Sequence, residues 1–365
     1  MNMTLDQKIG QMIMAGFSSD VLDDHAARII KDYKIGNIVL FSRNVRSVNG
    51  LARLCSEIQK AAISSSGMPA FISMDQEGGM VTRIQNGATF FPGNMAFSAA
   101  GLEGSTEIEG KLEGEELRAM GINVDLAPVL DVNNNPDNPV IGVRSYGDDK
   151  EVVAKLGTDF IKGLQRSGVM ATAKHFPGHG DTSVDSHLDL PCINHSLNRL
   201  NSIEFYPFRK AIESGVDAVM SAHVLFPAIE KDKLPATLSC KVLTDLLREQ
   251  MNFNGIVMTD CMEMEAIKNY FGTAKAAVMA VKAGADIICI SSSMNLQIES
   301  VCAIKQAVLY GEIPESRIDD SVNRIIKMKR KYGLFDNPYP DMEKAPCVVG
   351  SESNLKFAQN VSEKS

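Results

Sequence analysis

Several features that would point to particular classes of protein are missing from this sequence. It has no tryptophan, no apolar stretch long enough to span a bilayer, and no N-terminal secretory signal. Its seven cysteines are odd in number, are scattered between Cys55 and Cys347, and form no Cys-x-x-Cys pair. This pattern argues against a disulfide framework and against a zinc knuckle. We therefore expect a protein of the reducing cytoplasm with no membrane partner.

An excess of positive charge is also missing. The formal net charge is −8, and the basic residues form no stripe, which argues against nucleic acid as a partner. One basic run, from Lys327 to Lys331, closes a segment with helical spacing just before Gly333. Cations stabilise the C-terminal end of a helix, so we interpret this run as structural.

The composition is that of a folded globular protein, with 44% hydrophobic and 22% charged residues among 365. Short apolar runs rich in β-branched residues recur along the chain, and segments with helical spacing lie between them. They alternate poorly between apolar and polar residues, as is typical of parallel strands buried on both faces. The eight candidate strands are Gln11–Gly16, Gly36–Phe41, Ala70–Asp75, Ile122–Pro128, Met170–His175, Ala218–Val224, Gly255–Asp260 and Ile287–Ser291.

Eight strand-and-helix units predict an α/β fold of the (β/α)8 TIM-barrel type, with a doubly wound open sheet as the alternative. Residues 1–335 would form this barrel. Residues 336–365 begin with a proline-containing, linker-like stretch and end in what resembles the start of a helix. We expect this tail to lead into a second domain.

Polar residues end many of the predicted strands, which packing alone does not explain. A barrel brings the C-terminal ends of its strands together at one mouth, where its function lies. The residues at these ends are Asp75, Asp125, Asp131, Lys174, His175, His223 and Asp260.

The segment from Lys174 to His187 contains three of the six histidines, two aspartates, two glycines and a proline. No helix or strand can run through such a segment, so it is predicted to be a loop. Within it, Asp185 lies two residues before His187. A carboxylate there can orient the imidazole and stabilise its protonated form, which suits a general acid/base. His179 and Asp181 are rivals for the same role, and a polar surface turn is the simpler alternative.

Asp260 directly follows an apolar strand, so its carboxylate is predicted to stand fixed at the barrel mouth. This position suits nucleophilic attack on a developing oxocarbenium carbon. A structural role as the N-cap of the next helix is an equal alternative.

Five further residues are candidates for binding a polar ligand. Lys174 and His175 follow a buried strand, where a lysine is costly unless it is paired or points into a polar site. Asp75 precedes Gln-Glu-Gly-Gly, with Arg83 beyond. Arg144 could donate in a planar fork to a hydroxyl or carbonyl oxygen, or could form only a surface salt bridge.

These motifs resemble those of glycoside hydrolase family 3, and within it the β-N-acetylglucosaminidases of the NagZ type. The resemblance runs from about Leu5 to Leu334. It rests on four stretches, namely Asp75–Gly79 with Arg83, Asn123–Val132, the Lys174–His187 loop, and Thr259-Asp260.

The resemblance implies a retaining exo-β-N-acetylglucosaminidase. Asp260 would be the nucleophile, and His187 the general acid/base with Asp185 as its partner. The residues that hold the terminal GlcNAc would be Asp75, Arg83, Arg144, Lys174 and His175. No cofactor or metal is implied, and the substrate would be a small saccharide such as a cell-wall muropeptide or a chitooligosaccharide. Many family members continue into a second α/β domain beyond the region that this chain matches.

Three alternatives remain at this point. A histidine in place of a second carboxylate repels an anionic acceptor such as phosphate less strongly. A phosphorylase that uses the same mechanism is therefore the first alternative. A metal-dependent barrel hydrolase would use His175, His179, Asp181 and His187 as ligands, although their spacing is irregular. A non-catalytic sugar-binding barrel is the third. The lack of tryptophan argues against a long polysaccharide groove and favours a pocket for one terminal sugar.

Overall fold

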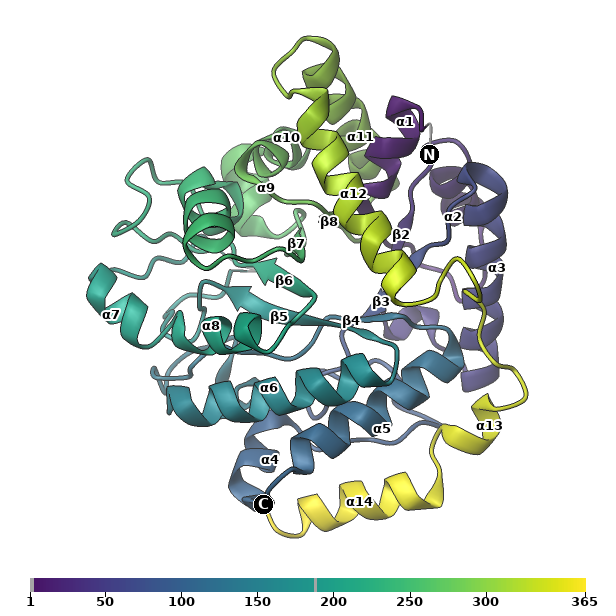
Figure 1. The fold of residues 1–365 in the computed structure, drawn as a ribbon, viewed down its shortest axis with the longest axis vertical. Coiled ribbons are helices and arrows are strands. Elements are labelled where there is room, and N and C mark those ends of the chain that lie inside the picture. The colour runs from purple at the N-terminus through teal and green to yellow at the C-terminus, as the bar shows by residue number, and fades with distance from the viewer. Residues whose placement is uncertain (1–2, 187–188) are drawn as a thin grey trace.

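The computed structural model describes residues 3–186 and 189–365, and it shows the predicted (β/α)8 barrel (Figure 1). Eight parallel strands follow the order β7-β6-β5-β4-β3-β2-β1-β8, and a parallel bridge between Met258 and Ile287 brings the two ends of this order together. All eight predicted strands are confirmed, and the open doubly wound sheet was wrong. The strands are β1 (Ile13–Ala15), β2 (Asn37–Leu40), β3 (Phe71–Met74), β4 (Val124–Asp125), β5 (Met170–Phe176), β6 (Ala218–Ser221), β7 (Ile256–Thr259) and β8 (Ile288–Ile290).

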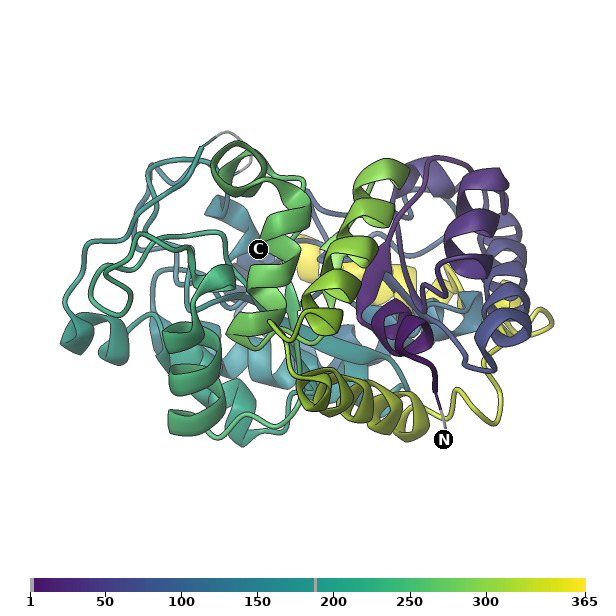
Figure 2. The ribbon, with the colours of Figure 1, turned by 90° about the horizontal axis from the view of Figure 1, so that it is seen from above.

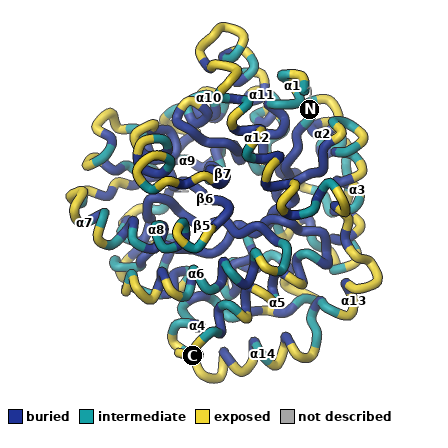
Figure 3. Tube along the Cα trace, viewed as in Figure 1, coloured by how far each residue is buried: buried dark blue, intermediate teal, exposed yellow. Residues whose placement is uncertain are grey.

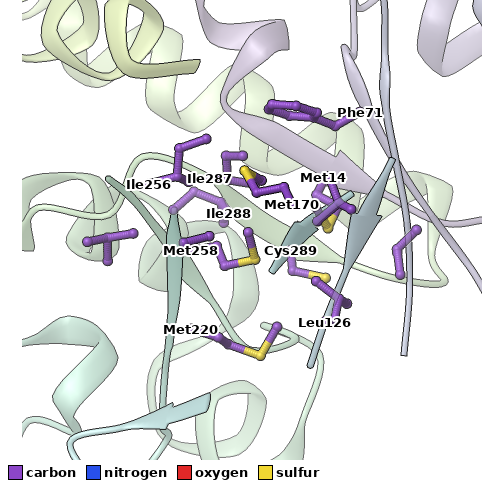
Figure 4. Close-up of a cluster of buried hydrophobic side chains, with 14 of the residues drawn as sticks. Met14, Phe71, Leu126, Met170, Met220, Ile256, Met258, Ile287, Ile288 and Cys289 are labelled. Carbon is purple, nitrogen blue, oxygen red and sulfur yellow. The ribbon is translucent and has the colours of Figure 1, made fainter. Parts of the chain in front are cut away.

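Every residue of these strands is buried, which explains why the runs lack polar alternation. One face of each strand packs against surrounding helices, and the other fills the barrel interior. Sulfur-containing and branched side chains meet there, among them Met14, Met258 and Ile287 (Figure 4). The interior is therefore a packed core, and the space for a ligand lies at the mouth.

Helices surround the strands (Figure 1). Figure 3 shows that burial is concentrated on the central strands, and that exposed residues lie on the outer helices and loops. The α-helices are α1 (Leu5–Gln11), α2 (Asp24–Lys31), α3 (Val48–Ser66), α4 (Asn94–Ala100), α5 (Ser105–Met120), α6 (Lys150–Arg166), α7 (Leu197–Ser202), α8 (Tyr206–Glu213), α9 (Glu265–Phe271), α10 (Thr273–Ala283), α11 (Met294–Leu309), α12 (Glu315–Lys331), α13 (Ala345–Val348) and α14 (Glu352–Ser362). Shorter or differently wound helices are η1 (Ser42–Asn44), η2 (Gly142–Arg144), η3 (Ala236–Leu238) and the π-helix η4 (Lys241–Gln250).

The basic run at the end of α12 is structural, as predicted, but through specific partners rather than the helix dipole alone. Lys329 is fully buried, and its ammonium donates to Gln11 Oε1 at 2.6 Å and to the Gly36 carbonyl at 3.0 Å. Lys331 forms an ion pair with Asp217 at 2.6 Å. The bonds of Lys329 fix α12 to the N-terminal part of the chain, and the ion pair of Lys331 fixes it to the segment before β6. Figure 2 shows this helix along the lower edge of the barrel near the N-terminus.

The C-terminal residues 336–365 include α13 and α14, and α14 lies beside α4 (Figure 1). The rings of Phe97 on α4 and Phe357 on α14 are 6.3 Å apart. The carboxylate of Glu116 accepts hydrogen bonds from Asn354 Nδ2 at 2.8 Å and from the Gly350 backbone N–H at 3.1 Å. This tail is therefore packed on the barrel through specific polar contacts. Across the described ranges, none of the helices combines the length and apolarity needed to cross a lipid bilayer.

Candidate active site

A cavity of about 500 Å³ lies at the C-terminal ends of the strands. Ligand pockets in proteins commonly have volumes of about 300–1,000 Å³. Six of the residues singled out from the sequence line this cavity, namely Asp75, Arg83, Arg144, Lys174, His175 and Asp260. The structure therefore brings together, from β3, β5, β7 and the loop after β4, groups that are up to 185 residues apart in sequence (Asp75 and Asp260).

Lys174 stands at the centre of an ion network on the cavity wall. Its side chain is only 2% exposed, and Nζ lies 2.9 Å from Asp75 Oδ1 and 2.5 Å from Glu77 Oε1. Arg83 donates to the other oxygen of Asp75 at 3.1 Å. The buried lysine is thus paired, which is the condition under which a charge is tolerated in this position.

Glu77 also belongs to this network, although it was not among the site residues predicted from the sequence. Arg144 binds it in a bidentate fork, with Nε 2.9 Å from Oε2 and a terminal nitrogen 2.8 Å from Oε1. The pair is not a surface salt bridge, because only 2% of the Glu77 side chain and 15% of the Arg144 side chain are exposed. The sequence signal was the following Gly78-Gly79. Both have positive φ, and a Cβ on Gly78 would lie 2.8 Å from the Pro92 carbonyl oxygen.

The network keeps its carboxylates ionised. Burial alone would raise the pKa of Glu77, but Arg144 and Lys174 outweigh it and hold that pKa well below its ordinary value. Burial likewise opposes ionisation of Asp75, yet Lys174 and Arg83 lower its pKa. Burial would lower the pKa of Lys174, and the two carboxylates more than offset this, so its pKa is raised. The cavity wall therefore offers fixed anions and cations to the hydroxyl and carbonyl groups of a ligand.

The other two strand-end aspartates lie behind the cavity. Asp131 is fully buried and accepts a hydrogen bond at 2.7 Å involving Nδ1 of His175, so it orients this ring. It also accepts from the backbone N–H of His179. Asp125 accepts from the Gln76 N–H at 3.0 Å, and burial raises its pKa to about 8. Asp131 therefore supports two histidines that line the cavity, and Asp125 supports the residue between Asp75 and Glu77.

His179, a rival for the acid/base role, is placed as a structural tether. Its Nδ1 lies 2.8 Å from Thr182 Oγ1 and its Nε2 lies 2.9 Å from Ser186 Oγ. Burial lowers its pKa to about 4, so the ring is neutral at pH 7. Both nitrogens are already hydrogen-bonded, which leaves neither available to exchange a proton with a ligand. This arrangement folds the loop back on itself and places Ser186 on the cavity wall.

Asp260 follows β7 and lies on the cavity wall. It is not the N-cap of the next helix, because α9 begins at Glu265 with Met264 as its N-cap. Its Oδ1 accepts from the backbone N–H of Cys261 at 2.6 Å. The Cys261 carbonyl is in turn bonded to Nε2 of His223 at 3.0 Å. His223 therefore helps to position the peptide that follows Asp260.

The predicted acid/base pair lies at the limit of the described chain. His187 falls outside the described residues. Asp185 lies in the loop, and its carbonyl accepts from the N–H of Asp189 at 3.0 Å. Ser186, between the two, is buried on the cavity wall, and its carbonyl accepts from the Ala266 N–H of α9 at 3.4 Å. The loop thus reaches across the mouth from β5 to α9.

The metal ligands expected for a metal-dependent hydrolase do not come together within the described ranges. Both ring nitrogens of His179 are occupied by hydroxyl groups, and Nδ1 of His175 by Asp131. Asp181 lies with His195 and Glu204 instead.

The ion network generates a prediction about stability and pH. The folded-state pKa of Glu77 lies below the unfolded value of about 4.3, so its ionised form stabilises the fold above that pH. This contribution is lost as the pH falls from about 4.3 through the folded-state pKa. We expect Glu77→Gln to lose about 3–5 kcal/mol of unfolding free energy at pH 7, because Arg144 then lacks its carboxylate partner and the buried Lys174 keeps only Asp75.

Urea unfolding at pH values from 7 to 3 measures both effects. The wild type should lose stability more steeply than Glu77→Gln at the acidic end. Glu352→Gln, at a side chain that is 83% exposed, is the control and should follow the wild type. Parallel curves for wild type and Glu77→Gln would contradict the assignment.

Comparison with known proteins gives a consistent result. The family model for the glycosyl hydrolase family 3 N-terminal domain matches residues 4–328. Beta-hexosaminidase A of Pseudoalteromonas piscicida is 34% identical over 372 residues, which cover 90% of this chain and 61% of that protein. Beta-hexosaminidase of Hydrogenovibrio crunogenus is 34% identical over 283 residues, which cover 76% of this chain and 77% of that protein.

A solved structure of a family 3 beta-N-acetylglucosaminidase from Paenibacillus sp. str. FPU-7 superposes with a TM-score of 0.95 at 46% identity. The match covers 100% of this chain and 69% of that one. This chain therefore spans less than two thirds of the first of these relatives and little more than two thirds of the solved structure. The family match extends over the whole barrel and includes every residue of the cavity wall described above, and so the chain is a member of the glycoside hydrolases of family 3.

Proposed function

We propose that this protein is a retaining exo-β-N-acetylglucosaminidase that removes a terminal non-reducing GlcNAc. The observation that carries the proposal is one cavity in which the carboxylate of Asp260 faces a wall of fixed charges, within a family 3 barrel. The names of the relatives at 34% and 46% identity support the choice of sugar. A cavity of about 500 Å³ in a chain without tryptophan suits one terminal sugar better than a long chain of them.

In the proposed reaction, the carboxylate of Asp260 attacks the anomeric carbon and forms a covalent glycosyl-aspartate. His187 gives a proton to the departing glycosidic oxygen. A water molecule then attacks the anomeric carbon, His187 takes its proton, and Asp260 is released. Two displacements at the same carbon return the sugar with its original configuration.

The ion network would hold the sugar during these steps. The carboxylate of Asp75 can accept from sugar hydroxyls, and Arg144 and Lys174 can donate to hydroxyl or acetamido oxygens. Arg83 and His175 border the same space. Because these groups are already fixed by one another, binding does not require them to be reordered, and this favours a preorganised site.

Histidine as acid/base leaves one permanent negative charge, that of Asp260, beside the reacting carbon. Asp185 would orient the imidazole and stabilise its protonated form. The natural leaving group is proposed to be MurNAc in a cell-wall muropeptide or a second GlcNAc in a chitooligosaccharide. A cytoplasmic role in peptidoglycan recycling would follow from the first of these.

The direct test is an activity assay with defined disaccharides. GlcNAc-β-1,4-MurNAc and chitobiose are incubated with the protein, with and without phosphate, and the products are followed by NMR. We expect GlcNAc released first as the β-anomer, at a rate that phosphate does not change. Formation of GlcNAc-1-phosphate would show a phosphorylase instead, and failure to release GlcNAc from any β-GlcNAc terminus would overturn the proposal.

The proposed nucleophile generates the next prediction. Asp260→Ala should lower kcat on the order of 10³-fold or more while keeping the fold, because the variant lacks the carboxylate that is proposed to form the covalent bond. A 5-fluoro glycoside should label Asp260 alone in the wild type, as read by mass spectrometry of peptides. The control is Asp232→Ala, whose side chain is 79% exposed. Wild-type kcat in Asp260→Ala would remove this residue from the mechanism.

The acid/base role predicts a dependence on the leaving group. His187→Ala should lose far more activity on disaccharides than on nitrophenyl glycosides, because nitrophenolate departs with little protonation. Asp185→Ala should show the same order with a smaller loss, since the histidine remains but is less well oriented. His25→Ala, on α2, is the matched histidine control. Equal losses on both substrate types in His187→Ala would exclude it as the acid.

A further inference from the structure

Beside the sugar cavity, three side chains capable of binding a metal converge from different segments. They are Asp181 in the loop after β5, His195 just before α7, and Glu204 between α7 and α8. One nitrogen of His195 and one oxygen of each carboxylate lie within 4.8 Å of one another. None of the three lines the sugar cavity.

The hydrogen bonds around this cluster leave one buried carboxylate oxygen unsatisfied. Nε2 of His195 is bonded to Asp181 Oδ2. Glu204 Oε1 accepts from Asn134 Nδ2 at 3.1 Å and from Arg199 at 3.3 Å. Glu204 is only 2% exposed, and in the described part of the chain its Oε2 has no hydrogen-bond partner. A buried carboxylate oxygen without a partner is costly, so it calls for a ligand.

A second unsatisfied acceptor lies next to it. Asn134 donates to Glu204 through Nδ2, and its own Oδ1 is buried with no partner within the described ranges. Arg199, whose side chain is 36% exposed, forms an ion pair with Glu204 and binds only one of its two oxygens. The cluster therefore combines surplus negative charge, an imidazole and spare oxygen acceptors at one point.

From this arrangement we propose that Asp181, His195 and Glu204 bind a divalent transition-metal ion of the zinc type, with the side-chain carbonyl of Asn134 as an additional oxygen close by. An imidazole with carboxylates suits zinc and its neighbours, whereas magnesium and calcium prefer oxygen ligands alone. Binding would replace the hydrogen bond between His195 and Asp181 by two bonds to the ion. It would also join the loop after β5 to the segments that flank α7.

The position of the cluster suggests what the ion would do. Asp181 lies four residues before Asp185 and six before His187 in the same loop. An ion held by Asp181 would fix the start of the loop that carries the proposed acid/base pair. This consequence rests on the proposed function, whereas the binding itself does not.

Calorimetric titration of the metal-stripped full chain with zinc chloride tests the binding. We expect one equivalent of zinc to bind, and the affinity to fall about tenfold or more in His195→Ala and in Glu204→Gln. His25→Ala and His187→Ala should bind zinc as the wild type does. The affinity should also fall as the pH is lowered from 7.5 to 5.5, because protons compete for the imidazole.

Thermal unfolding distinguishes loss of a ligand from loss of the fold. Zinc should raise the Tm of the wild type and of His187→Ala, but not that of His195→Ala or Glu204→Gln. If Glu204→Gln does not fold, Asp181→Asn, with a side chain that is 22% exposed before substitution, provides the same test. Absence of saturable zinc binding up to about 1 mM would overturn the proposal, since structural and catalytic zinc sites bind far more tightly. So would binding that is unchanged in both ligand variants, or that is lost in His187→Ala alone.

Discussion

The burial of one ammonium group, that of Lys174, sets the condition that the rest of the cavity satisfies. A lysine at the end of a fully buried strand is stable only with anions fixed around it, and Asp75 and Glu77 supply them. Those carboxylates in turn require Arg83 and Arg144 on their far sides. The turns after β3 and β4 are thereby fixed to β5 before any ligand arrives. Stability and recognition depend on the same contacts, so the wall of the cavity is part of the core.

Most of the fold was predictable because it is encoded locally. Each strand lies within a short apolar run, and many of these runs end in a polar residue, so this pattern predicted all eight strands and the position of Asp260 at the mouth. The predicted first and last residues of these elements were less accurate. The strands predicted at Gly36–Phe41 and Gly255–Asp260 are Asn37–Leu40 and Ile256–Thr259, one residue shorter at each end. Both deviations lie at the ends of an element, where assigned bounds commonly differ by one or two residues.

The parts of the site that were not predicted are side-chain contacts between segments distant in sequence. In the sequence, Glu77 is only one acidic residue before two glycines. Its bidentate ion pair with Arg144 joins residues that are 67 positions apart. Asp131 follows a predicted strand, as the other candidates do, yet it contacts His175 from behind the cavity. His179 and His187 are chemically alike in sequence, and only the hydroxyl partners of His179 identify it as structural. Side-chain direction at a loop is decided by tertiary contacts, which residue type and spacing do not contain.

The tether formed by His179 affects how a pH–rate profile of this protein is to be interpreted. With its pKa at about 4 in the fold, against about 6.5 in an unfolded chain, this ring stays neutral through the weakly acidic range. Its two bonds, to Thr182 and Ser186, therefore persist there, although protonation of the unfolded chain already reduces their net contribution to stability below about pH 6.5. A fall in turnover between pH 7 and pH 5 would then not arise from protonation of His179. Only near pH 4 would detachment of the loop itself enter the profile, as a second and steeper acidic limb.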